Sequence, residues 1–156
     1  MGTRRLSWGI ALCMVALCAL PATASAAMRK ATGKTNQGKA VSAWIRGDNS
    51  VALVKFAFKA KCRDPGYYWT DKMYFRDRPE GPFERQGEAF SDGGKYKMKY
   101  KDGPATFVAN MTGAPSPAGG WEGTFRISVR AYNRRGKMID FCKTRPLTWK
   151  VALPES

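Results

Sequence analysis

Residues 54–63 read Val-Lys-Phe-Ala-Phe-Lys-Ala-Lys-Cys-Arg, so apolar and basic side chains alternate, and only Ala57 interrupts the basic set. Successive side chains of a β-strand point to opposite faces of the sheet. This period of two therefore predicts a half-buried strand with its lysines in solvent. The same alternation puts Cys62 on the face of Phe56 and Phe58, toward the core.

The same period recurs along the rest of the chain. Residues 123–131 alternate in this way, and shorter runs do so at 41–45, 96–100, 107–111 and 147–151. Turn-forming residues separate these runs at 47–50, 64–66, 92–94, 101–104 and 133–136, and residues 113–120 predict a longer surface loop. Residues 27–38 predict a short flexible segment or an edge strand. Because no window shows a 3.6-residue stripe, we expect an all-β fold, an antiparallel β-sandwich or small barrel with one disulfide.

The first residues have the pattern of a secretory signal peptide. Arg4 and Arg5 are followed by an apolar run over residues 8–20 and by small residues that end at Ala26. This predicts cleavage between Ala26 and Ala27. The apolar run is shorter than the ~20 residues that cross a bilayer, and no later segment is long or apolar enough. We therefore expect residues 1–26 to be a signal peptide, residues 27–156 to be a single secreted β domain, and the protein to have no membrane span.

Two of the four cysteines, Cys13 and Cys18, would leave with the signal peptide. An exported protein meets an oxidising compartment, so the remaining pair, Cys62 and Cys142, is predicted to form a disulfide. Neither cysteine belongs to a Cys-x-x-Cys arrangement, which favours a structural bridge over a redox pair.

The chain is strongly basic. It carries 27 Lys+Arg against 12 Asp+Glu, a net charge of +15, and only two of these charged residues precede residue 27, which leaves +13 on the predicted domain. Such a charge draws a protein toward nucleic acid, phospholipid head groups and anionic extracellular polymers.

The sequence contains no histidine. This excludes Ser-His-Asp and Cys-His nucleophile systems and histidine-ligated zinc. A carboxylate pair of the glycosidase kind could still be drawn from five acidic residues, namely Asp71, Asp77, Glu80, Glu84 and Glu88. Solvated carboxylates that balance a lysine-rich surface explain them more simply. We therefore predict no enzymatic activity, no cofactor and no metal site.

Two basic rows are the candidate anion-binding residues. One row comprises Lys55, Lys59, Lys61 and Arg63, and the other comprises Lys95, Lys97, Lys99 and Lys101. If the two strands were neighbours, the rows would merge into one basic face, whose like charges repel unless an anionic partner relieves them. The alternative is that these lysines block edge-to-edge aggregation and keep an exported protein soluble.

A dense aromatic stretch follows the first of these rows. It contains Tyr67, Tyr68, Trp69, Tyr74 and Phe75. Because neighbouring side chains alternate, at least one of the first three is expected in solvent or in a loop. Exposed aromatic rings beside lysines could stack on bases or sugar rings, whereas buried rings would belong to the core.

The layout of several short motifs resembles small secreted disulfide-containing all-β proteins of high-GC Gram-positive (actinobacterial) type, a group without an assigned function. The motifs are Gly33-Lys34-Thr35-Asn36-Gln37-Gly38-Lys39, Ala60-Lys61-Cys62-Arg63-Asp64, Gly123-Thr124-Phe125-Arg126, Cys142-Lys143-Thr144 and Leu147-Thr148-Trp149-Lys150. The resemblance implies a disulfide-closed secreted β domain and brings no active-site residues with it.

Together these observations predict a non-catalytic secreted basic domain that binds an anionic polymer or a cell-surface component. One alternative is a structural or protein-interaction domain whose lysines serve only solubility. A less favoured alternative is a carboxylate-based hydrolase.

Overall fold

The computed structural model describes residues 28–154, which form ten β-strands and no helix. The strands are β1 (Arg29–Thr35), β2 (Ala40–Ile45), β3 (Val51–Cys62), β4 (Tyr68–Arg76), β5 (Glu84–Gln86), β6 (Ala89–Tyr100), β7 (Gly103–Pro115), β8 (Trp121–Tyr132), β9 (Met138–Lys143) and β10 (Leu147–Ala152). The predicted all-β fold is confirmed. The predicted signal peptide, residues 1–26, and its cleavage site at Ala26 and Ala27 lie outside the described residues. Within residues 28–154 there is no helix of the length and apolarity needed to cross a membrane.

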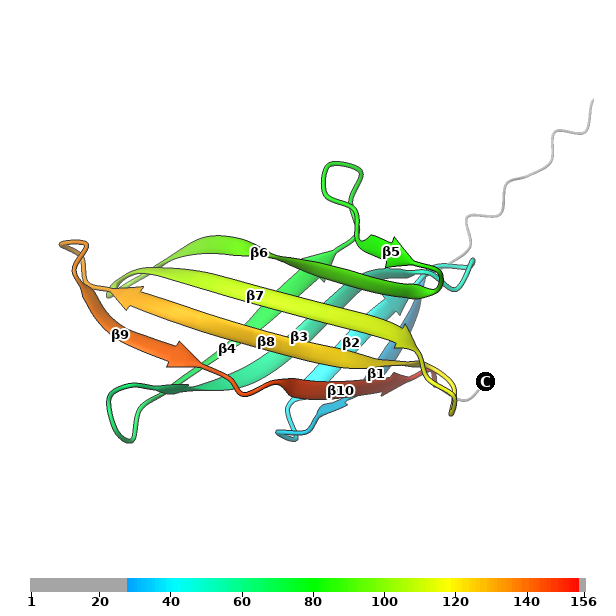
Figure 1. Cartoon of the computed structure of the whole chain (residues 1–156), viewed down its shortest axis with the longest axis horizontal. Coiled ribbons are helices and arrows are strands. Elements are labelled where there is room, and N and C mark those ends of the chain that lie inside the picture. The colour runs from blue at the N-terminus through cyan, green and yellow to red at the C-terminus, as the bar shows by residue number, and fades with distance from the viewer. Residues whose placement is uncertain (1–27, 155–156) are drawn as a thin grey trace, which may run out of the picture.

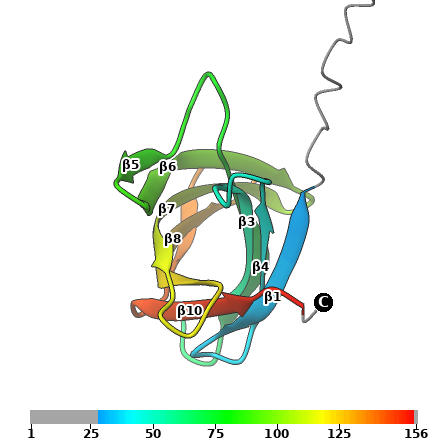
Figure 2. The ribbon, with the colours of Figure 1, turned by 90° about the vertical axis from the view of Figure 1, so that its right-hand side faces the viewer.

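All strand pairings are antiparallel and join the strands into one rolled sheet. β1 to β4 pair in chain order and form one layer, and β5 to β9 pair in chain order and form the other, which crosses the first at an angle (Figure 1). β10 joins the layers because it pairs with β1 on one side and with β8 on the other. Figure 2 shows the sheet end-on, curved around its interior. The sheet is therefore continuous, as in a small barrel, and flattened into two layers, as in a sandwich.

The core lies between the two layers and uses the apolar faces that the alternation predicted. Phe56 and Phe58 of β3 have no exposed surface, and Phe56 stacks on Phe125 of β8 with ring centroids 4.5 Å apart. Trp149 of β10 packs edge-on against Phe56, and its indole N–H donates to the carbonyl oxygens of Thr112 (3.0 Å) and Thr124 (3.2 Å). The only polar atom of this buried ring thus has partners.

The predicted disulfide is confirmed. Cys62, the last residue of β3, is bonded to Cys142 of β9, and both side chains are buried. The two cysteines are also register partners, in a pairing of β3 with β9 that comprises only Lys61↔Lys143 and Cys62↔Cys142. The disulfide therefore supplies a covalent bond where the two layers share very few backbone hydrogen bonds.

The turn predicted at residues 92–94 is wrong, because these residues lie inside β6. The chain reverses earlier, at the two residues between Gln86 and Ala89, where Gly87 has φ +61°. Gly93 pairs with Asn110 of β7, and a Cβ on Gly93 would lie only 3.0 Å from the Ala109 carbonyl oxygen of that strand. This glycine is required by close approach of a neighbouring strand rather than by a reversal.

Two further expectations need correction. The loop predicted at 113–120 is shorter, because β7 continues to Pro115 and leaves residues 116–120 as the connection to β8. The segment predicted as flexible or as an edge strand forms β1, which is paired on both sides, with β2 and with β10. The alternation of β1 is masked in the sequence because Gly33, with Lys150 and Val151 of β10 packed against it, occupies a core-side position.

The rolled sheet has one seam without backbone pairing, between β4 and β6. β4 pairs only with β3, whereas β6 pairs with β5 and β7. Side chains close this seam: the Tyr100 hydroxyl donates to the Asp71 carboxylate at 2.6 Å, and the Tyr100 ring packs edge-on against Trp69. Burial, followed by the hydrogen bond to Asp71, raises the pKa of Tyr100 above its ordinary value of 10.

Candidate anion-binding surface

The outer face of β1–β4 gathers cations and aromatic rings, and we call it the lysine face. Strand register puts seven basic residues and three aromatic residues on it: Lys30, Lys34, Lys55, Lys59, Lys61, Lys72, Arg76, Trp44, Tyr68 and Tyr74. The only carboxylate within these four strands is Asp71, which points to the other side and bonds Tyr100. The lysine face therefore carries positive charge, and no acidic side chain of its four strands projects from it.

Each aromatic ring of the lysine face has a lysine ammonium over it. The Nζ atom of Lys59 lies 3.9 Å from the centre of the Tyr68 ring, and that of Lys55 lies 5.0 Å from the Tyr74 ring. Lys30 lies 5.6 Å from Trp44 in the same way. Such contacts contribute about 0.5–1 kcal/mol at exposed sites. They hold the lysine head groups in defined places and partly offset the repulsion between them.

The two predicted basic rows do not merge. Lys55, Lys59 and Lys61 belong to the lysine face, and Arg63 lies in the loop that follows β3. The remaining predicted residues, Lys95, Lys97, Lys99 and Lys101, project from β6 and from the turn after it. β3 and β6 are not neighbours: β9, β8 and β7 lie between them in one direction around the sheet, and β4 and the unpaired seam lie between them in the other.

A pocket of about 950 Å³ opens at the end of the lysine face, and we call it the basic pocket. It lies between the β1–β2 turn, the end of β3 and the connection from β9 to β10. Six of its lining residues are cationic, namely Lys39, Lys59, Lys61, Arg63, Lys143 and Arg145. Apolar and neutral side chains complete it, namely Asn36, Gln37, Cys62, Tyr68, Phe141, Thr144, Pro146 and Leu147. No Asp or Glu is among these lining residues.

The pocket exists because strand pairing is interrupted along one side of β3. β3 pairs with β2 as far as Phe56 and with β9 from Lys61 onward. Between them, the Gln37 side chain takes the place of a strand: its Nε2 donates to the Lys59 carbonyl oxygen (2.8 Å), and its Oε1 accepts from the Lys59 N–H (3.1 Å). The backbone of β3 is satisfied here by an amide side chain, which leaves space that a strand would fill.

The opposite wall of the pocket is held by Thr144. Its N–H donates to the Ile127 carbonyl oxygen (3.0 Å), and its hydroxyl oxygen accepts from the Ile127 N–H (3.1 Å). These bonds fix the connection between β9 and β10 to the middle of β8. The next residues, Arg145 and Pro146, are exposed, and Pro146 has no N–H to pair with a neighbouring strand.

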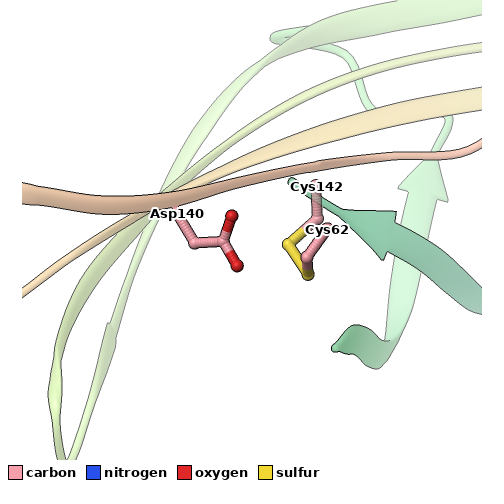
Figure 3. Close-up of side chains that lie close together, drawn as sticks. All are labelled: Cys62, Asp140 and Cys142. Atoms are coloured by element: carbon pink, nitrogen blue, oxygen red, sulfur yellow. A yellow bond between two sulfur atoms is a disulfide. The ribbon is translucent and has the colours of Figure 1, made fainter. Parts of the chain in front are cut away.

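Cys62, Cys142 and Asp140 come together below the pocket (Figure 3). Their potential ligand atoms lie within 4.8 Å of one another, a spacing that could hold a metal ion. Metal binding by cysteine needs a thiolate, whereas both sulfurs here form the disulfide. The Asp140 Oδ1 atom accepts from the N–H groups of Phe141 (2.7 Å) and Arg63 (3.2 Å). In the disulfide-bonded protein this cluster is therefore a cross-link that positions Arg63.

Four of the five acidic residues considered for catalysis have structural partners. Burial raises the pKa of Asp77, but hydrogen bonds from the Phe83 N–H, Arg46 and Arg85 outweigh it, so that the pKa is lowered overall. Asp71 bonds Tyr100, and two more of the five contact Arg78 and Ser91, namely Glu80 and Glu84. These contacts favour the view that the acidic residues stabilise the fold.

Several residues of the surface were missed by the sequence analysis. Lys72 and Arg76 alternate with Met73 and Phe75 in β4, so the same period of two could have found them. Lys143 could have been found from the disulfide, because pairing Cys62 with Cys142 in antiparallel strands puts Lys61 opposite Lys143. Lys39 and Arg145 leave no comparable signal, since they occupy a turn and a connection.

Comparisons of this chain with protein-family models, with curated proteins and with solved structures give no match. The resemblance to small secreted actinobacterial proteins therefore stays a prediction. What the surface can bind is inferred from its own geometry and charge.

Proposed function

We propose that this protein is a non-catalytic secreted domain that binds an anionic extracellular polymer through the lysine face. The observation that carries the proposal is the concentration of seven cations and three aromatic rings on β1–β4, with no carboxylate on that face.

The geometry of a sheet suits a polymer with repeated charges. Alternate residues along a strand are about 6.5–7 Å apart and neighbouring strands about 4.8 Å apart, so the cations form a two-dimensional grid. A chain of anionic groups can contact several of them at once and relieve their repulsion. Tyr68 and Tyr74 are about half exposed, at 50% and 51%, so their rings are also available to sugar rings or bases.

Position in the sheet favours a binding role for the lysines of β3. Lysines on an edge strand prevent pairing with another molecule. β3, however, is an inner strand, with β4 on one side and β2 and β9 on the other. Lys55, Lys59 and Lys61 are therefore not needed to protect an edge.

The alternative role, solubility alone, fits the lysines of β6. Beyond its short pairing with β5, β6 has no partner on its outer side, and the exposed residues Lys95, Lys97 and Lys99 lie along this part of the strand. We assign this second row to protection of the edge.

An extracellular location is part of the proposal. It is supported by the predicted signal peptide and by the disulfide between Cys62 and Cys142, since disulfides persist in oxidising compartments.

The test is a salt-dependent binding screen of the purified, disulfide-bonded protein against heparin, cell-wall polymer, DNA and anionic liposomes. Lys30→Gln/Lys55→Gln/Lys72→Gln removes three charges from the lysine face, and Lys95→Gln/Lys97→Gln/Lys99→Gln removes three from β6. We expect the first variant to lose about tenfold or more in affinity for a polysaccharide and the second about twofold or less. Equal losses, or no binding to any polymer at low salt, would contradict the proposal. Preference for DNA or for liposomes would replace the polymer with another anionic partner.

A further inference from the structure

The basic pocket brings cations together from three separate segments. Lys39 ends the β1–β2 turn, Lys59 and Lys61 belong to β3, Arg63 follows β3, and Lys143 and Arg145 come from β9 and the connection after it. Among residues 28–154, the ion pairs join other residues to Asp77, Glu80 and Glu122, and none involves these six cations. The lining of the pocket therefore carries six cations and no carboxylate, and the nearby Asp140 accepts from the backbone N–H of Arg63 without forming an ion pair with its side chain.

The disulfide forces two of these cations together. Because Cys62 and Cys142 are bonded as register partners, Lys61 is directly opposite Lys143 in the adjacent pair. The two positive charges repel each other, and an anion between them would attract both. The fold thus holds two like charges close together, and an anionic ligand bound between them would relieve their repulsion.

The pocket is not only basic, because its surface also includes apolar side chains. Phe141, Pro146 and the Tyr68 ring line it together with the cations. The Tyr68 ring carries the Lys59 ammonium at 3.9 Å, so an aromatic surface and a cation are held side by side. An inorganic ion has no apolar part that could pack against these side chains. The carbon skeleton of an organic anion can cover them and remove them from water.

The walls of the pocket are fixed in advance. Gln37 holds the β1–β2 turn to β3 by two hydrogen bonds, at 2.8 and 3.1 Å. Within that turn, the Thr35 hydroxyl oxygen accepts from the N–H groups of Gln37 (3.2 Å) and Lys39 (3.3 Å). Thr144 fixes the opposite wall to β8. Ligand binding therefore needs little ordering of the backbone, which favours affinity for a small molecule.

We infer that the basic pocket binds an organic phosphate, a doubly charged phosphate group carried on a ring-sized carbon skeleton. Its volume of about 950 Å³ is at the upper end of the range of about 300–1,000 Å³ typical of small-molecule sites. Two of the cations are arginines, Arg63 and Arg145, whose planar head groups match two phosphate oxygens at once. The other cations supply additional positive charge around the phosphate, and Phe141, Pro146 and Tyr68 contact the ring.

The inference can be tested separately from the proposed polymer binding, although Lys59, Lys61 and Tyr68 belong to both sites. Lys39, Lys143 and Arg145 line the pocket but do not belong to the lysine face, and Lys30, Lys55 and Lys72 belong to the lysine face but do not line the pocket. Variants of the two groups therefore separate the two activities.

The experiment is calorimetric titration of the disulfide-bonded protein with phenyl phosphate, glucose 6-phosphate, phenyl sulfate, inorganic phosphate and phenol. The salt concentration is about 150 mM, at which weak surface contacts are screened. We expect at least one of the two organic phosphates to bind about tenfold more tightly than inorganic phosphate or phenol. An organic phosphate can contact both the cations and the apolar side chains of the pocket, whereas the other two ligands contact only one kind. If neither organic phosphate binds more tightly than inorganic phosphate, the inference is wrong. Equal binding of phenyl sulfate and phenyl phosphate would overturn the assignment to phosphate.

Two matched variants locate the site. Lys143→Gln/Arg145→Gln should lower affinity for the organic phosphate about tenfold or more, whereas Lys95→Gln/Lys97→Gln, with the same loss of charge, should lower it about twofold or less. Lys30→Gln/Lys55→Gln/Lys72→Gln should leave it nearly unchanged, even if polymer binding fails. Equal losses in the pocket and β6 variants would show a general effect of net charge and would contradict the inference.

Competition identifies the source of the phosphate. If phenyl phosphate displaces a phosphate-containing wall polymer, the pocket takes a phosphate group of that polymer. If both bind together, the pocket takes a separate small molecule. Both outcomes support the inference.

Discussion

β3 and β6 share an alternation of lysines with other residues but have different places in the sheet. Each alternates lysines with core-facing residues, and each is a long strand, Val51–Cys62 and Ala89–Tyr100. β3 is paired on both sides and carries part of the core, with Phe56 and Phe58 fully buried. β6 borders an unpaired seam, and its Met98 remains 39% exposed. In our proposal, the lysines of β3 belong to a binding surface, whereas those of β6 protect an edge.

The largest difference between β3 and β6 should appear in the free energy of unfolding when a core-facing side chain is removed. Phe56→Ala removes a buried ring that stacks on Phe125 and should lower the free energy of unfolding by about 3–5 kcal/mol. Met98→Ala should cost less than about 1 kcal/mol, because much of that side chain is already in solvent. Urea unfolding followed by tryptophan fluorescence measures both values. Similar costs would mean that β6 contributes to the core as β3 does.

Removal of the disulfide should have the next largest effect on the free energy of unfolding. Cys62→Ala/Cys142→Ala should lower the free energy of unfolding by about 2–5 kcal/mol, because the bridge closes a long loop and joins β3 to β9. Unfolding of the native and the double-alanine protein in guanidinium chloride gives the difference. Amide hydrogen exchange should show faster exchange at Lys61 and Lys143 than in the bridged protein. Unchanged exchange there would indicate that backbone pairing alone holds the two strands.

The seam along β6 should respond to alkaline pH instead. The pKa of Tyr100 is raised in the folded protein above its ordinary value of 10, chiefly by burial and then by the bond to Asp71. The stabilisation is complete below pH 10, where the unfolded chain also keeps the proton, and is lost as pH rises beyond 10. Thermal unfolding from pH 8 to 11 measures this slope.

Tyr100→Phe is the control for that slope. It removes the hydroxyl, should cost about 1–2 kcal/mol at neutral pH because Asp71 loses its partner, and should flatten the alkaline slope. A variant with the same slope as the native protein would assign the pH dependence to other groups.

The smallest effect on stability is expected from the lysines themselves. Lys95→Thr/Lys97→Thr/Lys99→Thr and Lys55→Thr/Lys59→Thr/Lys61→Thr should each change the free energy of unfolding by less than about 1 kcal/mol, since these are surface positions. Their association should differ, because β6 has an unpaired edge and β3 is paired on both sides. Light scattering at high protein concentration should rise for the β6 variant and stay low for the β3 variant. Association of the β3 variant instead would reverse the roles given to the two strands.

The sequence predicted those features of the fold that depend on neighbouring residues in the chain, and it missed features that depend on distant strands. Alternation located β3 and β8 and put Cys62 on the core side, because strand faces follow from a period of two. It failed at Gly93 and Gly94, because a pair of glycines is typical of a turn but also occurs inside a strand that another strand approaches closely. The sequence alone does not separate these two uses of glycine.

The basic pocket shows the same limit. Lys59, Lys61 and Arg63 were among the predicted anion-binding residues, and they do line it. Their partners Lys39 and Arg145 come from distant segments, which meet only through the register of β1, β3 and β10. That register depends on pairings between residues more than a hundred positions apart, such as Thr32 with Ala152, and no local pattern encodes it.

The pairing of β1 with β10 also affects when this chain can fold. Apart from the short pairing of β3 with β9, the two layers are joined through β10, which pairs with β1 and with β8, so this side of the sheet stays open until residue 152 has been synthesised. Contacts between such distant segments form slowly, because a long loop must close before any of them stabilises the fold. We therefore expect the pairing of β1 with β10 to be a late step in folding, after the pairings between neighbouring strands within β1–β4 and β5–β9.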